Sequence, residues 1–131
     1  MERVKVAEQV IALIADVLGR RPSEVTLQSR LMDDLGAESL DYLDIVFQLE
    51  DRFGVKITRG EMERAARGDM ADEEFAPGGI VSAVGLARLR ELLPESSAHI
   101  KEGLRASAIL SLFTVETFVK IAERKLAEAG R

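Results

Sequence analysis

The sequence predicts an all-α protein, and three observations support this prediction. Apolar residues recur every three to four positions in several segments, which is the spacing of a helix with one buried face. Residues that end helices, such as Gly19, Gly54 and Pro94, follow these segments. The stretch between Pro22 and Ser39 contains only scattered apolar residues and has no strand pattern.

The first predicted helix covers residues 4–18 and ends at Gly19. Its buried stripe consists of Val6, Val10, Leu13, Ile14 and Val17. The segment that follows, up to residue 38, is long for a connection in a compact domain. Such loops are usually functional or are held down by their own apolar side chains. The expected anchors are Leu27, Leu31 and Leu35.

The second predicted helix covers residues 39–53 and has two apolar stripes when each residue is rotated by about 100° around the axis. The broader stripe, which is the expected core face, consists of Tyr42, Ile45, Val46, Leu49 and Phe53. The narrower stripe consists of Leu40, Leu43 and Phe47. Acidic residues border the narrower stripe, so it is either a docking surface or a second face buried inside a small bundle.

Two further helices are predicted over residues 58–68 and 82–93, with an acidic loop at residues 68–79 between them. Ser82 can cap the later helix, and Pro94 stops it. The expected buried residues of that helix are Val84, Leu86, Leu89, Leu92 and Leu93.

The residues after Pro94 are too apolar to stay solvated. They include Ile100, Leu104, Leu110, Leu112 and Phe113. Thr114 can cap a final amphipathic helix that extends to Ala129, and its apolar side must pack against another part of the chain. We therefore expect a helical bundle at residues 1–94 and a helical C-terminal extension at residues 95–131, packed on or beside the bundle.

Composition excludes several kinds of site. With 131 residues and 47% hydrophobic positions, the chain can bury one modest core. The absence of cysteine removes disulfides and thiolate chemistry, and a single histidine, His99, leaves no multi-histidine metal site. No apolar run approaches the length of a membrane span. We expect a cytoplasmic monomer without a bound metal.

The net charge of −5 is concentrated in the middle of the chain. Between Leu31 and Asp51 there are seven carboxylates and no lysine or arginine. A surface of this kind repels nucleic acid phosphates and attracts partners with basic patches. The expected partners are therefore proteins and not nucleic acid.

Ser39 is the candidate functional residue. A hydrolase nucleophile needs a base within hydrogen-bond reach and usually a glycine-flanked turn. The residues around Ser39 do not have the Gly-x-Ser-x-Gly pattern, and the only histidine is far along the chain. We therefore expect that Ser39 is not a catalytic residue. The simplest remaining role is a helix cap, which serine fills without any chemistry.

The residues around Ser39 resemble the acyl carrier proteins. Residues 35–41 read Leu-Gly-Ala-Glu-Ser-Leu-Asp, two residues lead to Asp44, and the helix closes with Phe53 and Gly54. The likeness is without gaps over residues 35–57, and the order of the helices extends it over roughly residues 4–93. It implies an acyl-carrier-like bundle of four helices with additional C-terminal helices. It also implies a carrier with no catalytic residue and no enzymatic activity of its own.

The resemblance implies that Ser39 carries a covalent phosphopantetheine arm, attached by a phosphopantetheinyl transferase that uses coenzyme A. A phosphate suits this position because helix N-termini favour anions. The arm would hold an acyl group as a thioester for fatty-acid, lipid or polyketide biosynthetic enzymes that have basic docking patches. The residues implied in partner recognition are Glu38, Leu40, Asp41, Leu43, Asp44, Phe47 and Glu50. Those implied in an acyl pocket are Tyr42, Val46 and Leu49.

Two alternatives remain open. A peptidyl or aminoacyl carrier uses the same serine chemistry but usually has a less acidic recognition helix. An unmodified helical interaction module would use Ser39 only as a helix cap. The residues after Pro94 have no counterpart in the shortest family members. They form additional core, a lid or enlarged pocket for a long acyl chain, or a face for one dedicated enzyme.

Overall fold

The computed structural model describes residues 2–130, apart from the side chains of residues 59 and 95. Over this range the chain forms α helices and short 3-10 turns and contains no strand, which confirms the predicted all-α fold. The α helices are α1 (Arg3–Leu18), α2 (Ser39–Phe53), α3 (Arg59–Arg67), α4 (Asp72–Phe75), α5 (Ala83–Leu92) and α6 (Val115–Glu128). The 3-10 turns are η1 (Pro22–Glu24), η2 (Pro77–Gly79), η3 (Pro94–His99) and η4 (Ala106–Leu112). None of the helices described is both long enough and apolar enough to cross a membrane.

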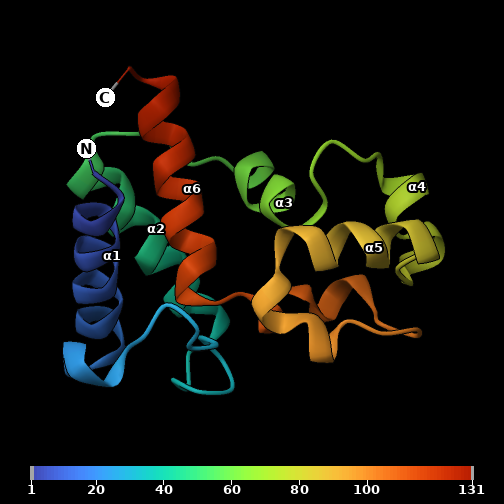
Figure 1. Cartoon of the computed structure of the whole chain (residues 1–131), viewed down its shortest axis with the longest axis horizontal. Coiled ribbons are helices and arrows are strands. Elements are labelled where there is room, and N and C mark those ends of the chain that lie inside the picture. Colours follow the sequence, from blue (N-terminus) through green and yellow to red (C-terminus); the bar gives the residue numbers. More distant parts are fainter. Residues whose placement is uncertain (1, 131) are drawn as a thin grey trace.

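Helices α1, α2 and α6 form the main bundle. α1 packs most extensively against α6 and α2, and Figure 1 shows α6 beside α1 with both chain ends at the same end of the bundle. The predicted stripe of α1 is buried, except that Val17 is only half-buried. α6 contributes the fully buried side chains of Val115, Phe118, Val119 and Ala122. Burial of an apolar side chain of this size stabilises the fold by about 1.5–3 kcal/mol relative to exposure.

The structure brings helices from both sides of the predicted boundary at residue 94 into contact with one another. α6, assigned to the extension, lies in the bundle, whereas α5, assigned to the bundle, packs mainly on α3, α4 and η3. Residues 68–113, here called the connecting segment, thus lie between two helices that contact each other, α3 and α6. The reason is physical: an apolar stripe shows that a helix packs, but it does not show which helix it meets.

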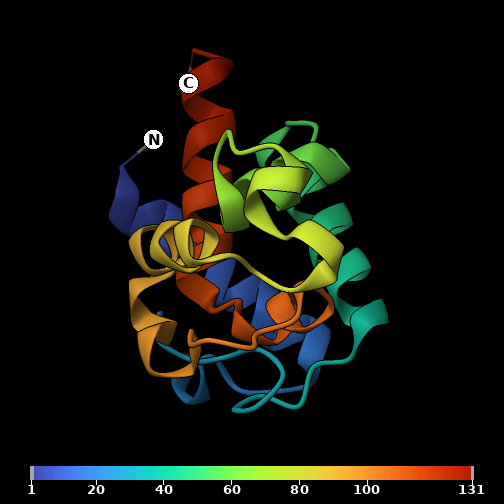
Figure 2. The ribbon, with the colours of Figure 1, turned by 90° about the vertical axis from the view of Figure 1, so that its right-hand side faces the viewer.

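The connecting segment is a series of short turns around α5 (Figure 2). Backbone hydrogen bonds join its parts, from Val81 N to Leu104 O at 2.9 Å and from Ser82 N to Phe75 O at 2.8 Å. The predicted acidic loop contains α4, whose Phe75 is buried.

The predicted buried set of residues 82–93 was wrong at Val84, and Leu92 is only half-buried. Val84 is 61% exposed, and Gly85 is buried instead. A Cβ atom built on Gly85 would lie 2.5 Å from the backbone oxygen of Phe75, which is closer than atoms can approach. α5 therefore turns its glycine toward α4, and this rotation leaves Val84 on the solvent side.

The first loop (residues 19–38) is fixed to the start of α6. Leu31 and Leu35 are buried and Leu27 is half-buried, so the predicted anchors do pack inward. Backbone hydrogen bonds run from Leu31 N to Phe113 O at 3.2 Å and from Glu116 N to Leu27 O at 3.0 Å. These contacts hold the loop that leads into α2 against the start of α6.

Candidate functional site

Ser39 is the first residue of α2, immediately after a tightly held turn. Gly36 adopts a left-handed backbone conformation with φ of 73°, and Ala37 N donates to Leu31 O at 2.8 Å. Glu38, in an extended conformation, occupies the position before the helix, and its N–H donates to Asp41 Oδ2 at 2.8 Å. Glu38 and not Ser39 is therefore the N-cap residue. The Ser39 side chain is exposed.

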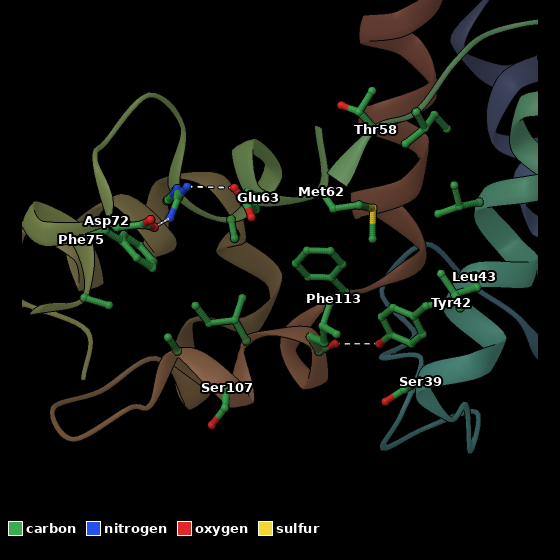
Figure 3. Close-up of a pocket in the computed structure, with 18 residues that line it drawn as sticks. Ser39, Tyr42, Leu43, Thr58, Met62, Glu63, Asp72, Phe75, Ser107 and Phe113 are labelled. Carbon is green, nitrogen blue, oxygen red and sulfur yellow. Dashed lines mark hydrogen bonds and ion pairs between the residues drawn. The ribbon is translucent and has the colours of Figure 1, made fainter. Parts of the chain in front are cut away.

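A cavity of about 780 Å³ opens beside Ser39. This volume is in the range of small-molecule sites, about 300–1,000 Å³. In Figure 3, Ser39 lies at one end of the lining, Phe113 and Met62 lie in the middle, and Asp72 and Phe75 lie at the other end. Apolar side chains dominate the wall between the two ends. They are Tyr42, Leu43, Val46, Ile57, Met62, Ala66, Phe75, Ala76, Ala106, Ile109, Leu110 and Phe113.

Of the three residues predicted to form a pocket, two line the cavity and one does not. Tyr42 and Val46 line the cavity, but Leu49 does not, because it is fully buried in the core. Leu43, predicted for the partner surface, both lines the cavity and is 58% exposed. The lining residues beyond α2 were missed. They come from α3, α4, η4 and the residues next to these elements, and no periodic signal in the sequence joins them.

Tyr42 connects α2 to the connecting segment. Its hydroxyl donates to Leu110 O at 2.7 Å, and its ring centroid lies 6.4 Å from that of Phe113 and 5.8 Å from that of Phe118. Burial raises the pKa of the phenol, and the nearby carboxylate of Asp33 raises it further. Tyr42 is therefore neutral and remains a hydrogen-bond donor at neutral pH.

The narrower stripe of α2 is exposed. Leu40 is 74% exposed and Phe47 is 67% exposed, so the packing excludes the alternative of a second buried face. Together with Leu43 they form an apolar surface on one side of α2, here called the α2 surface. Exposed apolar residues grouped in this way are typical of protein-binding sites.

The acidic residues predicted around the α2 surface have different local roles. Glu38 and Asp44 are exposed. Asp41 accepts the hydrogen bond from Glu38 N, and Glu50 Oε2 accepts one from Ile57 N at 2.8 Å. Asp41 and Glu50 thus also hold the two ends of α2 in place, which the sequence pattern did not predict.

A charged cluster lies at the end of the cavity opposite Ser39. Arg67 Nη2 donates to Glu63 Oε2 at 2.9 Å, and Arg67 Nη1 pairs with Asp72. Both contacts appear as dashed lines in Figure 3. These hydrogen bonds use two of the five N–H groups of the guanidinium.

No group of side chains suited to hold a metal ion occurs within residues 2–130. The histidine, His99, lies outside the cavity lining, and its Nε2 is 2.6 Å from Arg30 Nη1. The site thus consists of an exposed serine, an apolar cavity, a charged far end and an adjacent apolar surface.

Comparison with known proteins assigns the family. The sequence model described as "Phosphopantetheine attachment site" matches residues 8–66. A protein of Thermotoga maritima named "Acyl carrier protein" is 40% identical over 62 residues, which cover 47% of this chain and 76% of the relative. This chain belongs to the acyl carrier protein family. Acyl carrier proteins are carriers and not catalysts, and their cofactor is covalently bound phosphopantetheine.

The structure around Ser39 fits this cofactor. An exposed hydroxyl in the first turn of α2 lies where helix backbone N–H groups are available to a phosphate. The cavity that begins beside it is mostly apolar. Acyl carrier proteins interact with phosphopantetheinyl transferases and with biosynthetic enzymes. The family match ends at residue 66, so the connecting segment lies outside it.

Proposed function

We propose that Ser39 is the attachment point and that this protein carries an acyl group for enzymes of fatty-acid, lipid or polyketide biosynthesis. The observation that supports this proposal is the position of Ser39, exposed at the start of α2 and at the open end of an apolar cavity. In the transfer reaction the Ser39 oxygen forms a bond to the phosphorus of coenzyme A that carries the pantetheine. The pyrophosphate P–O bond at that phosphorus breaks, adenosine bisphosphate leaves, and the hydroxyl proton of Ser39 passes to a base of the transferase. The thiol of the arm supplies the thioester that holds the acyl group.

The residues of this chain have separate tasks in the proposal. The backbone N–H groups at the start of α2 stabilise the phosphodiester on Ser39. Tyr42 and Val46 shelter the first part of the acyl chain, and each sheltered methylene favours the enclosed state by about 0.8 kcal/mol. Leu49, which is part of the core, has no contact with the cargo in this proposal.

The α2 surface is the proposed binding site for partner enzymes. Leu40, Leu43 and Phe47 provide apolar contact, and the acidic residues Glu38, Asp41, Asp44 and Glu50 face basic patches on the transferase and later enzymes. Charges at the rim of an interface mainly accelerate association and orient the partners. The monomeric state and the cytoplasmic location remain predictions from the sequence.

An intact-mass measurement tests the attachment point. The protein is incubated with coenzyme A and a broad-specificity phosphopantetheinyl transferase, and we expect the mass of one phosphopantetheine to be added. Ser39→Ala should abolish this gain. Ser107→Ala is the matched control, because Ser107 is another exposed serine in the cavity lining. A wild type that gains no mass, or a Ser39→Ala variant that gains it, would refute the proposal.

Charge reversal tests the α2 surface. Asp44→Arg should lower the kcat/KM of the transferase about tenfold at low salt, because it weakens electrostatic steering, and the difference should shrink as salt screens it. Glu73→Arg, which reverses an exposed acid in the connecting segment, is the control. An equal loss of kcat/KM in the two variants would show that the rate depends only on the net charge of the protein, and it would contradict binding at the α2 surface.

A further inference from the structure

The cavity has two walls from different parts of the chain. α2, α3 and the residues between them form one wall, which includes Tyr42, Val46 and Met62. The connecting segment forms the other wall. Its apolar lining residues are Phe75, Ala76, Ala106, Ile109, Leu110 and Phe113. Because the family match ends at residue 66, this second wall lies outside the matched region.

The second wall is held against α2 close to Ser39. The hydroxyl of Tyr42, three residues after Ser39, donates to Leu110 O at 2.7 Å. Ser96 Oγ, which is fully buried, donates to the adjacent carbonyl of Leu112 at 2.7 Å. η4 is thus fixed by polar contacts on both sides, and the cavity is already present without cargo.

The chemistry of the lining changes along the cavity. Starting from Ser39 the side chains are mostly apolar, and the opposite end is occupied by the cluster of Glu63, Arg67 and Asp72 (Figure 3). Methylene groups gain free energy along the apolar part. A methyl end that reaches the cluster displaces water from charged groups without replacing its hydrogen bonds, which is unfavourable. The free energy gained by enclosing the chain should therefore increase with chain length until the chain reaches the cluster, and then stop increasing.

We propose that the connecting segment makes this cavity a length-selecting site for an aliphatic acyl chain, with the Glu63–Arg67–Asp72 cluster as its far limit. This inference rests on the proposed attachment at Ser39. It names the cargo class that the site takes, and it assigns the selectivity to residues of η4 and α4.

Thioester protection measures the selection. Full-length protein is loaded with hexanoyl, decanoyl, tetradecanoyl or octadecanoyl phosphopantetheine, and the rate of thioester cleavage by hydroxylamine is recorded for each. In the wild type, protection should increase from hexanoyl onward and level off within the series. A flat profile over all four chains would overturn the inference.

A cavity-filling variant tests the second wall. Ala106 is half-buried and lines the cavity. In Ala106→Phe the larger side chain should occupy space that the acyl chain would otherwise use. Protection of the longest sheltered chain should decrease about tenfold, the effect of excluding roughly two methylenes, while hexanoyl changes less than about twofold. Ala108→Phe is the matched control, because Ala108 belongs to η4 but does not line the cavity.

The outcomes separate this inference from the proposed function. If Ser39 cannot be loaded, the proposed function fails. If loading is normal but Ala106→Phe and wild type protect every chain equally, only the length-selecting site fails. Circular dichroism checks that Ala106→Phe is folded. If it is not, Ala106→Met is used instead, and it should lower the thioester protection of the same chains by a smaller factor.

Discussion

The main bundle and the connecting segment are built differently. The bundle consists of three helices of 14 to 16 residues that bury continuous apolar stripes against one another. The connecting segment has one helix of 10 residues, and its other elements are three to seven residues long and are joined by individual hydrogen bonds. The bundle thus fixes the position of Ser39, whereas the connecting segment shapes one wall of the cavity. Substitutions in the connecting segment can therefore change the shape of the cavity without changing the position of Ser39.

The largest expected effect comes from the residue that joins the two regions. Phe118 of α6 is fully buried, and its ring lies 5.8 Å from that of Tyr42 and 6.0 Å from that of Phe113. Phe118→Ala should lower the free energy of unfolding by about 3–5 kcal/mol, because a buried aromatic ring is lost and a cavity remains. Urea denaturation measures this change. Val4→Ala, at a residue that is 66% exposed, is the control and should change stability by less than about 0.5 kcal/mol.

A smaller effect, confined to the connecting segment, is expected at Gly85. Gly85→Ala places a Cβ against the backbone oxygen of Phe75 and should cost about 1–3 kcal/mol, because backbone atoms must shift. Hydrogen exchange should become faster in α4 and α5 while amides of α1 and α6 keep their protection. Ala87→Ser, at an exposed position of the same helix, is the control. Uniformly faster exchange in all helices would contradict the separation of the two regions.

The limits of the helices could be predicted from the sequence, but which helices pack against one another could not. The predicted limits of residues 39–53 agree with α2, because apolar period and the stop at Gly54 are local signals. The place of α6 in the bundle was not predictable in this way, since packing partners are set by the whole chain. The same holds for the rotation of α5 that exposes Val84 and buries Gly85.

For the candidate site, too, the sequence predicted local features but not tertiary contacts. Ser39 and the exposed α2 surface lie on one continuous segment, so their arrangement followed from helix geometry. The second wall of the cavity comes from 3-10 turns, which have no regular apolar period, and it meets α2 only through tertiary contacts. Leu49 was assigned to the pocket because it shares a stripe with Val46, but it faces the core.

Removal of the Tyr42 hydroxyl should weaken the contact between the main bundle and the connecting segment without unfolding either region. Tyr42→Phe loses the hydrogen bond to Leu110 O, although that carbonyl still accepts one from Phe113 N at 3.2 Å. The expected cost is about 0.5–1.5 kcal/mol. Exchange of η4 amides should become faster, and urea unfolding should shift slightly. A variant as stable as wild type, with unchanged exchange in η4, would show that the ring contacts alone hold the wall.

The smallest effect at neutral pH concerns the ionisation of Tyr42. Burial, followed by the charge of Asp33, raises the pKa of the phenol in the folded protein above its ordinary value of about 10. Above pH 10 the unfolded chain therefore releases a proton that the folded protein keeps. The stabilisation is complete below pH 10 and is lost as the pH rises through the folded pKa.

This ionisation can be followed directly, because the chain has one tyrosine and no tryptophan. Phenolate absorbance should appear near pH 10 in denaturant and only at higher pH in the folded protein. Asp33→Asn should lower the folded pKa by a small amount, since burial is the larger cause. A folded titration near pH 10 would mean that water reaches the phenol, and the contact between α2 and η4 would then be open in solution.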